Sequence, residues 1–151
     1  MARVKIVVLG AGAIGSVYGF LLSGRHDVTL VGSPAHVQAI REHGLRVEGT
    51  VRSGTFQINA VTSLERIDPG TLILLTTKAS SSVEAITPIV PLLTPTVTIL
   101  CVQNGLYSER LVSALVGDRA VTLRAITQVG SILRGPRPAA RSKRSRRLSR
   151  C

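Results

Sequence analysis

The sequence predicts an α/β fold built on a mainly parallel sheet, and three observations lead to this prediction. Short runs of Val, Ile and Leu alternate along the chain with segments of helical character, joined by short connections. This alternation is typical of parallel strands joined by crossover helices. Hydrophobic residues make up 44% of the 151 residues but aromatic residues only 3%, and an aliphatic core suits strands buried on both faces. Finally, the first apolar run leads directly into a glycine-rich turn.

The first part of the chain predicts two strands and two helices. Ser33 and Pro34 favour a helix start, since Ser can cap a helix and Pro is tolerated at its first position. Gly44 favours the end of that helix. The predicted elements are a strand at 4–9, a helix at 12–22, a strand at 27–31 and a helix from 34 to about 43.

The remaining elements continue the alternation. Residues 45–61 contain two alternating segments around Gly49 and Gly54, which predict a small hairpin or two short strands. The further predictions are a short helix or turn at 63–67, a strand at 71–76, a helix at 80–90 interrupted at Pro88, a strand at 96–102, a helix at 107–115 and a strand at 120–127.

The glycine turn has the spacing Gly-x-Gly-x-x-Gly at Gly10, Gly12 and Gly15. Gly10 permits a sharp bend, Gly12 lets a pyrophosphate approach the backbone, and Gly15 allows close packing of helix on strand. The amide groups at the helix start and the helix dipole would bind the anion. Because the turn follows a strand and opens a helix, it predicts a Rossmann-type, doubly wound fold that binds a dinucleotide.

The end of the second strand bears on the choice of cofactor. An NAD-binding unit usually places Asp or Glu there for the ribose hydroxyls, whereas this chain has Gly32 and Ser33. The missing carboxylate favours NADP, since a carboxylate would repel the 2′-phosphate, and Ser33 could donate to that phosphate. The alternative is that Ser33 serves only as a helix cap.

Several motifs together resemble one family. The motifs GAGAIGSVYG, HDVTLVG, GLRVEG, LLTTKA and VQNGL occur in this order, and they are similar to the nucleotide-binding half of ketopantoate reductases (2-dehydropantoate 2-reductases). The resemblance covers about residues 1–133. It implies a cytoplasmic oxidoreductase activity, the NADPH-dependent reduction of 2-dehydropantoate, a small 2-keto acid, to pantoate in pantothenate biosynthesis.

The resemblance also implies site residues. Lys78 would lie near the cofactor and active site, Asn104 beside the nicotinamide end, and Gly130 near a further cofactor contact. Lys78 and Asn104 each follow a predicted strand, and ligands bind outside the carboxyl ends of such strands. The NADP loop would consist of Gly10, Ala11, Gly12, Ala13, Ile14 and Gly15.

The sequence departs from the family pattern in two places. The family often has Arg where this chain has Ser33. The absence of this arginine weakens the prediction that the chain prefers NADP over NAD. The family continues into a helical C-terminal domain that carries a catalytic lysine and a glutamate, and nothing in this chain matches that domain. We therefore predict no catalytic residue and no metal site in this chain, weak NADP(H) binding and negligible activity alone. Self-association through exposed apolar surface is a further expectation.

The charge is concentrated at the end of the chain. Seven of the 19 basic residues and none of the eight acidic ones lie in 135–151, which leaves a net charge of +4 on residues 1–134. We predict a basic, disordered tail at 134–151. A nucleic-acid-binding arm is one interpretation, but the body shows no nucleic-acid motif. Our preferred hypothesis is that this tail results from translation in a shifted reading frame. The nucleotide sequence of the gene tests it, because restoring the frame near codon 133 should then reveal a second domain.

Two cysteines make no disulfide framework, and Cys101, inside an apolar run, predicts a buried thiol in a reducing cytoplasm. No stretch reaches the length of a membrane span. Two other functions stay open: a stand-alone NADP-binding regulatory module whose basic tail recruits a partner, and a dehydrogenase with the same nucleotide domain that acts on a different hydroxy acid.

Overall fold

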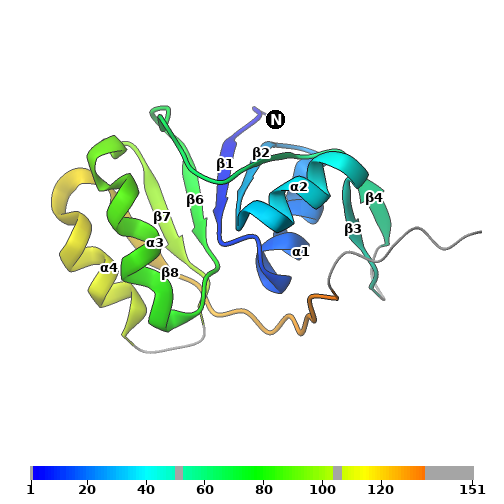
Figure 1. Cartoon of the computed structure of the whole chain (residues 1–151). Helices are drawn as coiled ribbons and strands as arrows, with labels where there is room; N and C mark the ends of the chain where they lie inside the picture. Colours follow the sequence, from blue (N-terminus) through cyan, green and yellow to red (C-terminus); the bar gives the residue numbers. More distant parts are fainter. Residues whose placement is uncertain (1, 50–52, 104–106, 135–151) are drawn as a thin grey trace, which may run out of the picture.

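The main sheet has six parallel strands in the order β5-β2-β1-β6-β7-β8 (Figure 1). The structure is a computed structural model, and it describes residues 2–49, 53–103 and 107–134. The order places β1 and β6 side by side at the centre, where the chain reverses its direction of winding. The strands are β1 (Lys5–Leu9), β2 (Asp27–Val31), β5 (Asn59–Val61), β6 (Leu72–Leu75), β7 (Thr98–Cys101) and β8 (Val121–Arg124).

Helices cover both faces of this sheet (Figure 1). The helices α1 (Ala13–Ser23) and α2 (Pro34–His43) pack on one face, and α3 (Ser82–Ile86) and α4 (Ser108–Val116) pack on the other. Short 3-10 helices adjoin these at η1 (Ala79–Ser81), η2 (Thr87–Leu92) and η3 (Gly117–Arg119). The fold is therefore the doubly wound α/β arrangement predicted from the sequence.

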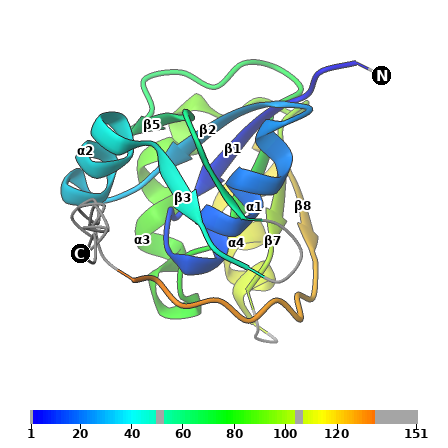
Figure 2. The same cartoon turned by 90° about the vertical axis from the view of Figure 1, so that its right-hand side faces the viewer.

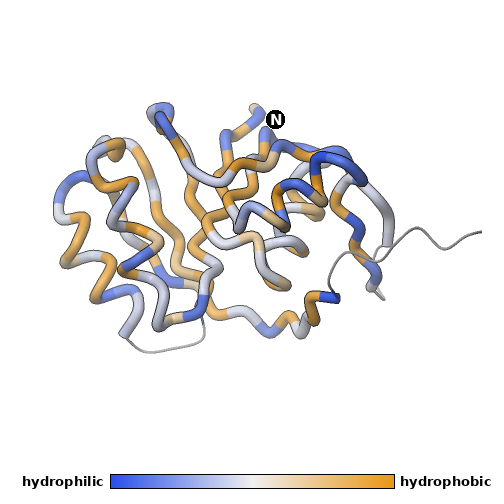
Figure 3. The backbone as a smooth tube through the Cα atoms, viewed as in Figure 1, coloured by the Kyte–Doolittle hydropathy of each residue, from blue (hydrophilic) through white to orange (hydrophobic). Residues whose placement is uncertain are grey.

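Each strand supplies the two faces with alternate side chains. In β1, Ile6 and Val8 enter the core beneath α1 and α2, while Val7 and Leu9 enter the core beneath α3 and α4. This alternation explains why the strands are apolar throughout, since both faces are buried. Figure 3 shows the consequence as a concentration of hydrophobic residues along the central strands.

A small antiparallel hairpin lies outside the main sheet. It pairs β3 (Leu45–Val47) with β4 (Gly54–Phe56), as the sequence predicted. The hairpin is attached to α1 through Phe56, whose ring meets that of Phe20 edge-on with centroids 4.9 Å apart. Figure 2 shows β3 beside α1 on this side of the molecule.

Some elements differ from the predictions. The strand β5, which is third along the chain among the strands of the main sheet, was not predicted as an element distinct from the hairpin. Residues 63–67 form bends without a helix. The helix predicted at 80–90 is interrupted near Pro88 as expected, since α3 ends at Ile86, and the segment is further divided into η1, α3 and η2. Pro88 and Pro91 lie inside η2, where the missing amide of proline and its ring oppose a continuous α-helix.

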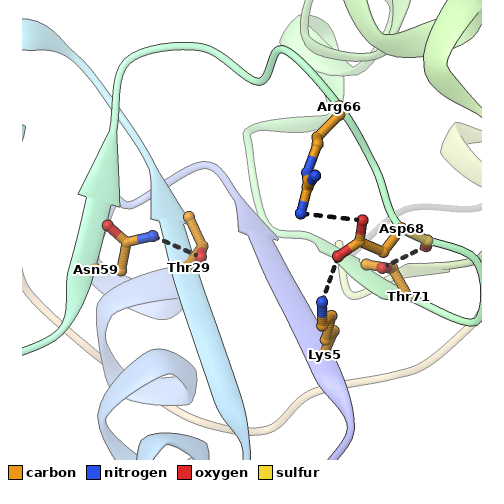
Figure 4. A network of polar contacts seen from close by, with 6 residues as sticks. All are labelled: Lys5, Thr29, Asn59, Arg66, Asp68 and Thr71. Carbon is orange, nitrogen blue, oxygen red and sulfur yellow. Dashed lines mark hydrogen bonds and ion pairs between the residues drawn. The ribbon is translucent and has the colours of Figure 1, made fainter.

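The amino edge of the sheet is held by ion pairs. Lys5 of β1 contacts Asp68, which precedes β6, and Arg66 lies 3.5 Å from the same carboxylate (Figure 4). The hydrogen bond from Lys5 is the main reason why the pKa of Asp68 is lowered. Farther along this sheet, Asn59 Nδ2 donates to Thr29 Oγ1 at 3.0 Å, between β5 and β2.

Cys101 ends β7 and is 1% exposed, which confirms the predicted buried thiol. Burial, together with the negative charge of Glu109, raises the pKa of Cys101 to about 11. The thiolate is the reactive form of cysteine, so Cys101 is an inert part of the core. Among the helices that the structure describes, none has the length and apolar character needed to cross a bilayer.

Candidate cofactor-binding site

The glycine turn between β1 and α1 is fixed by hydrogen bonds from three directions. The amides of Gly10 and Ala11 both donate to the carbonyl of Val31 at the end of β2, at 3.1 and 2.9 Å. The Gly12 amide donates to the Gly10 carbonyl at 2.8 Å. From β6, Thr76 Oγ1 donates to the same Gly10 carbonyl at 2.7 Å. The turn is therefore held between the carboxyl ends of β2 and β6.

Two glycines of the turn are required by the fold itself. Gly10 has φ 111°, a conformation that side chains oppose, and a Cβ there would lie 2.7 Å from the amide nitrogen of Thr77. A Cβ on Gly15 would lie 2.1 Å from the Gly10 carbonyl oxygen. These positions confirm two of the three predicted roles, namely the sharp bend and the close packing of helix on strand.

The remaining part of the turn is open and supplies donors. The amides of Ala13, Ile14 and Gly15 lie in the first turn of α1, where no earlier helical carbonyl can accept their hydrogen bonds. At the N-cap that precedes them, a Cβ built on Gly12 would meet nothing within 4 Å. Three amides, the positive end of the helix dipole and an open space without a side chain suit a pyrophosphate. The residues present therefore fit the phosphate group of a dinucleotide.

Ser33 and His36 lie at the start of α2, shortly after the carboxyl end of β2. Ser33 is the N-cap of α2 and is exposed, but its hydroxyl makes no capping hydrogen bond in the described structure. Ser33 and Pro34 therefore begin α2 as predicted, although the Ser33 side chain contributes no capping hydrogen bond. His36 is half-buried, and its Nε2 lies 3.4 Å from Ser16 Oγ of α1. Burial lowers the pKa of His36.

Lys78 lies on the same edge, after β6. It is exposed and forms the N-cap of η1, with its carbonyl accepting a hydrogen bond from the Ser81 amide at 2.9 Å. The neighbouring strand β7 brings the side chain of Gln103 to this loop, where it donates to the Thr77 carbonyl at 2.9 Å. Since the parallel strands end at one edge, Lys78 shares that edge with the glycine turn.

The segment 125–134 runs from β8 along this carboxyl edge in both views (Figures 1 and 2). It is attached to α1 by a hydrogen bond of 2.8 Å from the Tyr18 hydroxyl to Thr127 Oγ1. Gly130 belongs to this segment and is exposed, and its role near a cofactor contact stays a prediction. Asn104 lies outside the described residues.

The sequence analysis missed three side chains that shape this edge. Thr76 was taken as the last residue of a strand, yet its hydroxyl fixes the glycine turn. Gln103 was part of a family motif without a role of its own, and it connects β7 with the Lys78 loop. His36 was read as an ordinary helix residue. A polar residue directly after an apolar strand was the available signal for Thr76 and Gln103.

The chain is similar in sequence to one family of known proteins. A family model described as "Ketopantoate reductase PanE/ApbA" matches residues 6–146. The 2-dehydropantoate 2-reductase of Pyrococcus horikoshii is 39% identical over 135 residues, which cover 87% of this chain and 42% of that protein. The chain therefore spans less than half the length of this curated relative.

Solved structures show the same fold. The PanE/ApbA family ketopantoate reductase of Ralstonia eutropha JMP134 matches with a TM-score of 0.77 and 29% identity, over 87% of this chain and 44% of that one. D-mandelate dehydrogenase, solved with NADH and anilino(oxo)acetate, matches with a TM-score of 0.76 and 31% identity, over 87% and 43% of the two chains.

Proposed function

The chain belongs to the ketopantoate reductase family, and we propose that it binds NADP(H) at the carboxyl edge of its sheet as the cofactor-binding part of a 2-dehydropantoate 2-reductase. The observation that carries this proposal is the open glycine turn. It presents three amides without intrahelical partners, and a Cβ built on the preceding Gly12 would meet nothing within 4 Å. In this reaction class a bound nicotinamide dinucleotide supplies the hydride that reduces a 2-keto acid.

The chain's own residues would divide the remaining tasks. The amides of Ala13, Ile14 and Gly15 bind the pyrophosphate, and the exposed hydroxyl of Ser33 donates to the 2′-phosphate. Lys78 places a positive charge at the same edge, beside either a cofactor phosphate or the carboxylate of the keto acid. Proton transfer to the developing alkoxide requires an acid, and we assign none to this chain. We therefore expect residues 1–151 to bind the cofactor but to reduce the keto acid at a negligible rate. The proposed location of the chain is the cytoplasm.

A second candidate function is a dehydrogenase of the same fold that uses NADH and acts on a different 2-hydroxy acid. The likeness to D-mandelate dehydrogenase, which was solved with NADH, favours this candidate. The end of β2 carries Ser33 in place of the arginine that the family often has. Titrating the chain with NADPH and with NADH separates the two candidates, because tighter binding of NADPH supports recognition of the 2′-phosphate.

The variant Gly12→Ala tests the phosphate site directly. Its methyl group meets no protein atom within 4 Å, so the fold should tolerate it with a loss of less than about 1 kcal/mol in unfolding free energy. The same methyl group enters the space of the pyrophosphate. We expect the NADPH affinity to fall by about tenfold or more, which corresponds to about 1.4 kcal/mol. Fluorescence titration measures the affinity, and urea denaturation measures the stability.

Gly24→Ala is the matched control. Gly24 lies at the opposite end of α1 and also has nothing within 4 Å of a built Cβ, so this variant should bind NADPH like the wild type. Equal affinities for the wild type and Gly12→Ala would contradict the proposed site. Failure of the wild type to bind either dinucleotide would contradict the proposed function.

A further inference from the structure

We propose that Gln103 is a positioning residue that fixes Lys78 at the carboxyl edge of the sheet. Lys78 itself is exposed, whereas Gln103 is 8% exposed and lies in the segment that follows the neighbouring strand β7. The inference goes beyond the proposed function by giving a role to a residue that would not touch the cofactor. It rests on that function only in its expectation that Lys78 contacts the bound dinucleotide.

The hydrogen bonds of Gln103 reach both sides of Lys78. Gln103 Nε2 donates to the Thr77 carbonyl at 2.9 Å and lies 3.1 Å from Thr77 Oγ1. It also donates to Ser82 Oγ at 2.8 Å, and Ser82 Oγ donates in turn to the Ala79 carbonyl at 2.8 Å. Ser82 is fully buried, so solvent does not compete strongly for these bonds.

These bonds fix the backbone on each side of the lysine. The Thr77 carbonyl belongs to the peptide group that precedes Lys78, and the Ala79 carbonyl to the residue that follows it. The Lys78 carbonyl accepts from the Ser81 amide at 2.9 Å. The Gln103 amide, directly at Thr77 and through Ser82 at Ala79, therefore supports the backbone on both sides of Lys78, whose side chain is exposed.

The unpaired half of the Gln103 amide supports a role beyond core packing. Its Oε1 is buried and has no hydrogen-bond partner within the part of the chain that the structure describes. A buried acceptor without a partner opposes folding, whereas an apolar side chain of similar shape avoids this cost. The amide is therefore poorly suited as a core residue and well suited as a donor to the Lys78 loop.

A double-mutant cycle tests whether Gln103 acts through Lys78. Gln103→Met keeps the shape of the side chain but removes the donor, and Lys78→Ala removes the charge. We expect each single variant to weaken NADPH binding by about three- to tenfold, and the double variant to bind no more weakly than Lys78→Ala. Additive losses would overturn the inference, since independent sites add. A non-additive cycle with Asn104→Ala in place of Lys78→Ala would also overturn it.

Amide hydrogen exchange supplies a readout that needs no cofactor. We expect exchange of the Ser81 amide to accelerate about tenfold in Gln103→Met, while the Val37 amide of α2 keeps its rate. Ser82→Ala should give a smaller effect in the same direction, and it serves if Gln103→Met does not fold. Unchanged Ser81 exchange in these variants would overturn the inference. Faster exchange without any effect of Lys78→Ala on NADPH affinity would instead contradict the proposed contact of Lys78 with cofactor.

Thr71→Val is the matched control for stability. Thr71 lies at the amino end of β6, is 3% exposed and donates to the Asp68 carbonyl at 2.7 Å. The variant removes a side-chain hydrogen bond to a backbone carbonyl at the amino end of β6, whereas Gln103 donates to the backbone beyond the carboxyl end of β6. It should lower the unfolding free energy without changing NADPH affinity or Ser81 exchange. A loss of affinity in Thr71→Val equal to that in Gln103→Met would show a general effect of stability and overturn the inference.

Discussion

Individual residues of the glycine turn have separable roles in folding and in binding. Gly15 is necessary for the packing of α1 on β1, because any side chain there would overlap the Gly10 carbonyl. Gly12 has open space around it and is necessary only if a ligand approaches. The three glycines of the motif are therefore subject to different physical constraints. Substitutions can distinguish a glycine that folding requires from one that ligand binding requires.

His36 predicts a dependence of stability on pH. Burial lowers its pKa from the usual value of 6.5, so the folded chain favours the neutral imidazole. As the pH falls below 6.5, the unfolded chain binds the proton more readily, and the unfolding free energy decreases. We expect the wild type to lose more stability between pH 7.5 and pH 5.8 than His36→Gln does. Urea denaturation of both proteins at both pH values measures this difference.

The same comparison contains its own control. Every other titratable group is common to the two proteins, so its contribution cancels when the two changes in stability are subtracted. An equal loss of stability in the wild type and in His36→Gln would show that burial of His36 does not penalise its charged form.

Single residues also show where prediction from sequence ends. The glycine spacing identified Gly10 and Gly15 correctly, because positive φ and close contact leave glycine as the practical choice. Ser33 begins α2 as predicted, but whether its hydroxyl caps the helix or donates to a 2′-phosphate was left open, and it makes no capping hydrogen bond. A hydroxyl can serve a cap or face a ligand equally well, so the residue type alone did not decide between them. Thr76 and Gln103 act across the sheet, and partners about 66 and 21 residues away are invisible in a local pattern.

At the scale of elements, the position of the segment 125–134 depends on its contact with α1. The Tyr18 hydroxyl donates to Thr127 Oγ1 at 2.8 Å, and Thr127 is 8% exposed. We expect Tyr18→Phe to lower the unfolding free energy by about 1 kcal/mol. Thr127→Val should have a similar effect, and the double variant should be little worse than either single one. Thermal or urea denaturation of the four proteins completes this cycle, and full additivity would contradict the contact.

The elements themselves were predicted well where the periodicity was strong. The strand at 27–31 and the helix ending at His43 agree with β2 and α2. β5 is only three residues long and begins at an exposed Asn59, so no alternation distinguished it from the hairpin. α3 is shorter than expected since Pro88 and Pro91 oppose α-helical hydrogen bonds. The position of β5 therefore depends on tertiary pairing, whereas the length of α3 follows from the two prolines.

At the scale of the whole molecule, an apolar strip remains exposed along β8 and the segment that follows it. Its residues are between 41% and 84% exposed, and they are Val121, Leu123, Ile126, Val129, Ile132 and Leu133. Within residues 2–49, 53–103 and 107–134, β8 pairs with β7 alone, so its outer edge in this part of the chain also carries unpaired backbone groups. Exposed apolar strips and free strand edges both favour association. We therefore propose that the isolated chain self-associates through this strip.

The variant Leu123→Lys tests this proposal. Leu123 is 50% exposed, so a lysine is accommodated, and its charge opposes burial in an interface. We expect light scattering after size-exclusion chromatography to show a mass that rises with concentration in the wild type and less so in Leu123→Lys. Leu111→Lys is the control, because Leu111 of α4 is 53% exposed and lies outside the strip. Equal association of the three proteins would exclude the strip as the contact.

The strand order has a further consequence for how the protein could be assembled. β5 ends one half of the sheet at Val61, and β6 begins the other half at Leu72. The connecting residues Thr62, Ser63, Glu65 and Arg66 are exposed, while β1 and β6 pair from Ile6↔Leu72 to Leu9↔Leu75. A backbone cut in this connection would leave two fragments with a shared seam of hydrogen bonds and apolar side chains. Such a split protein should reassemble by complementation, and the glycine turn, held by Thr76 from the other fragment, would report that reassembly.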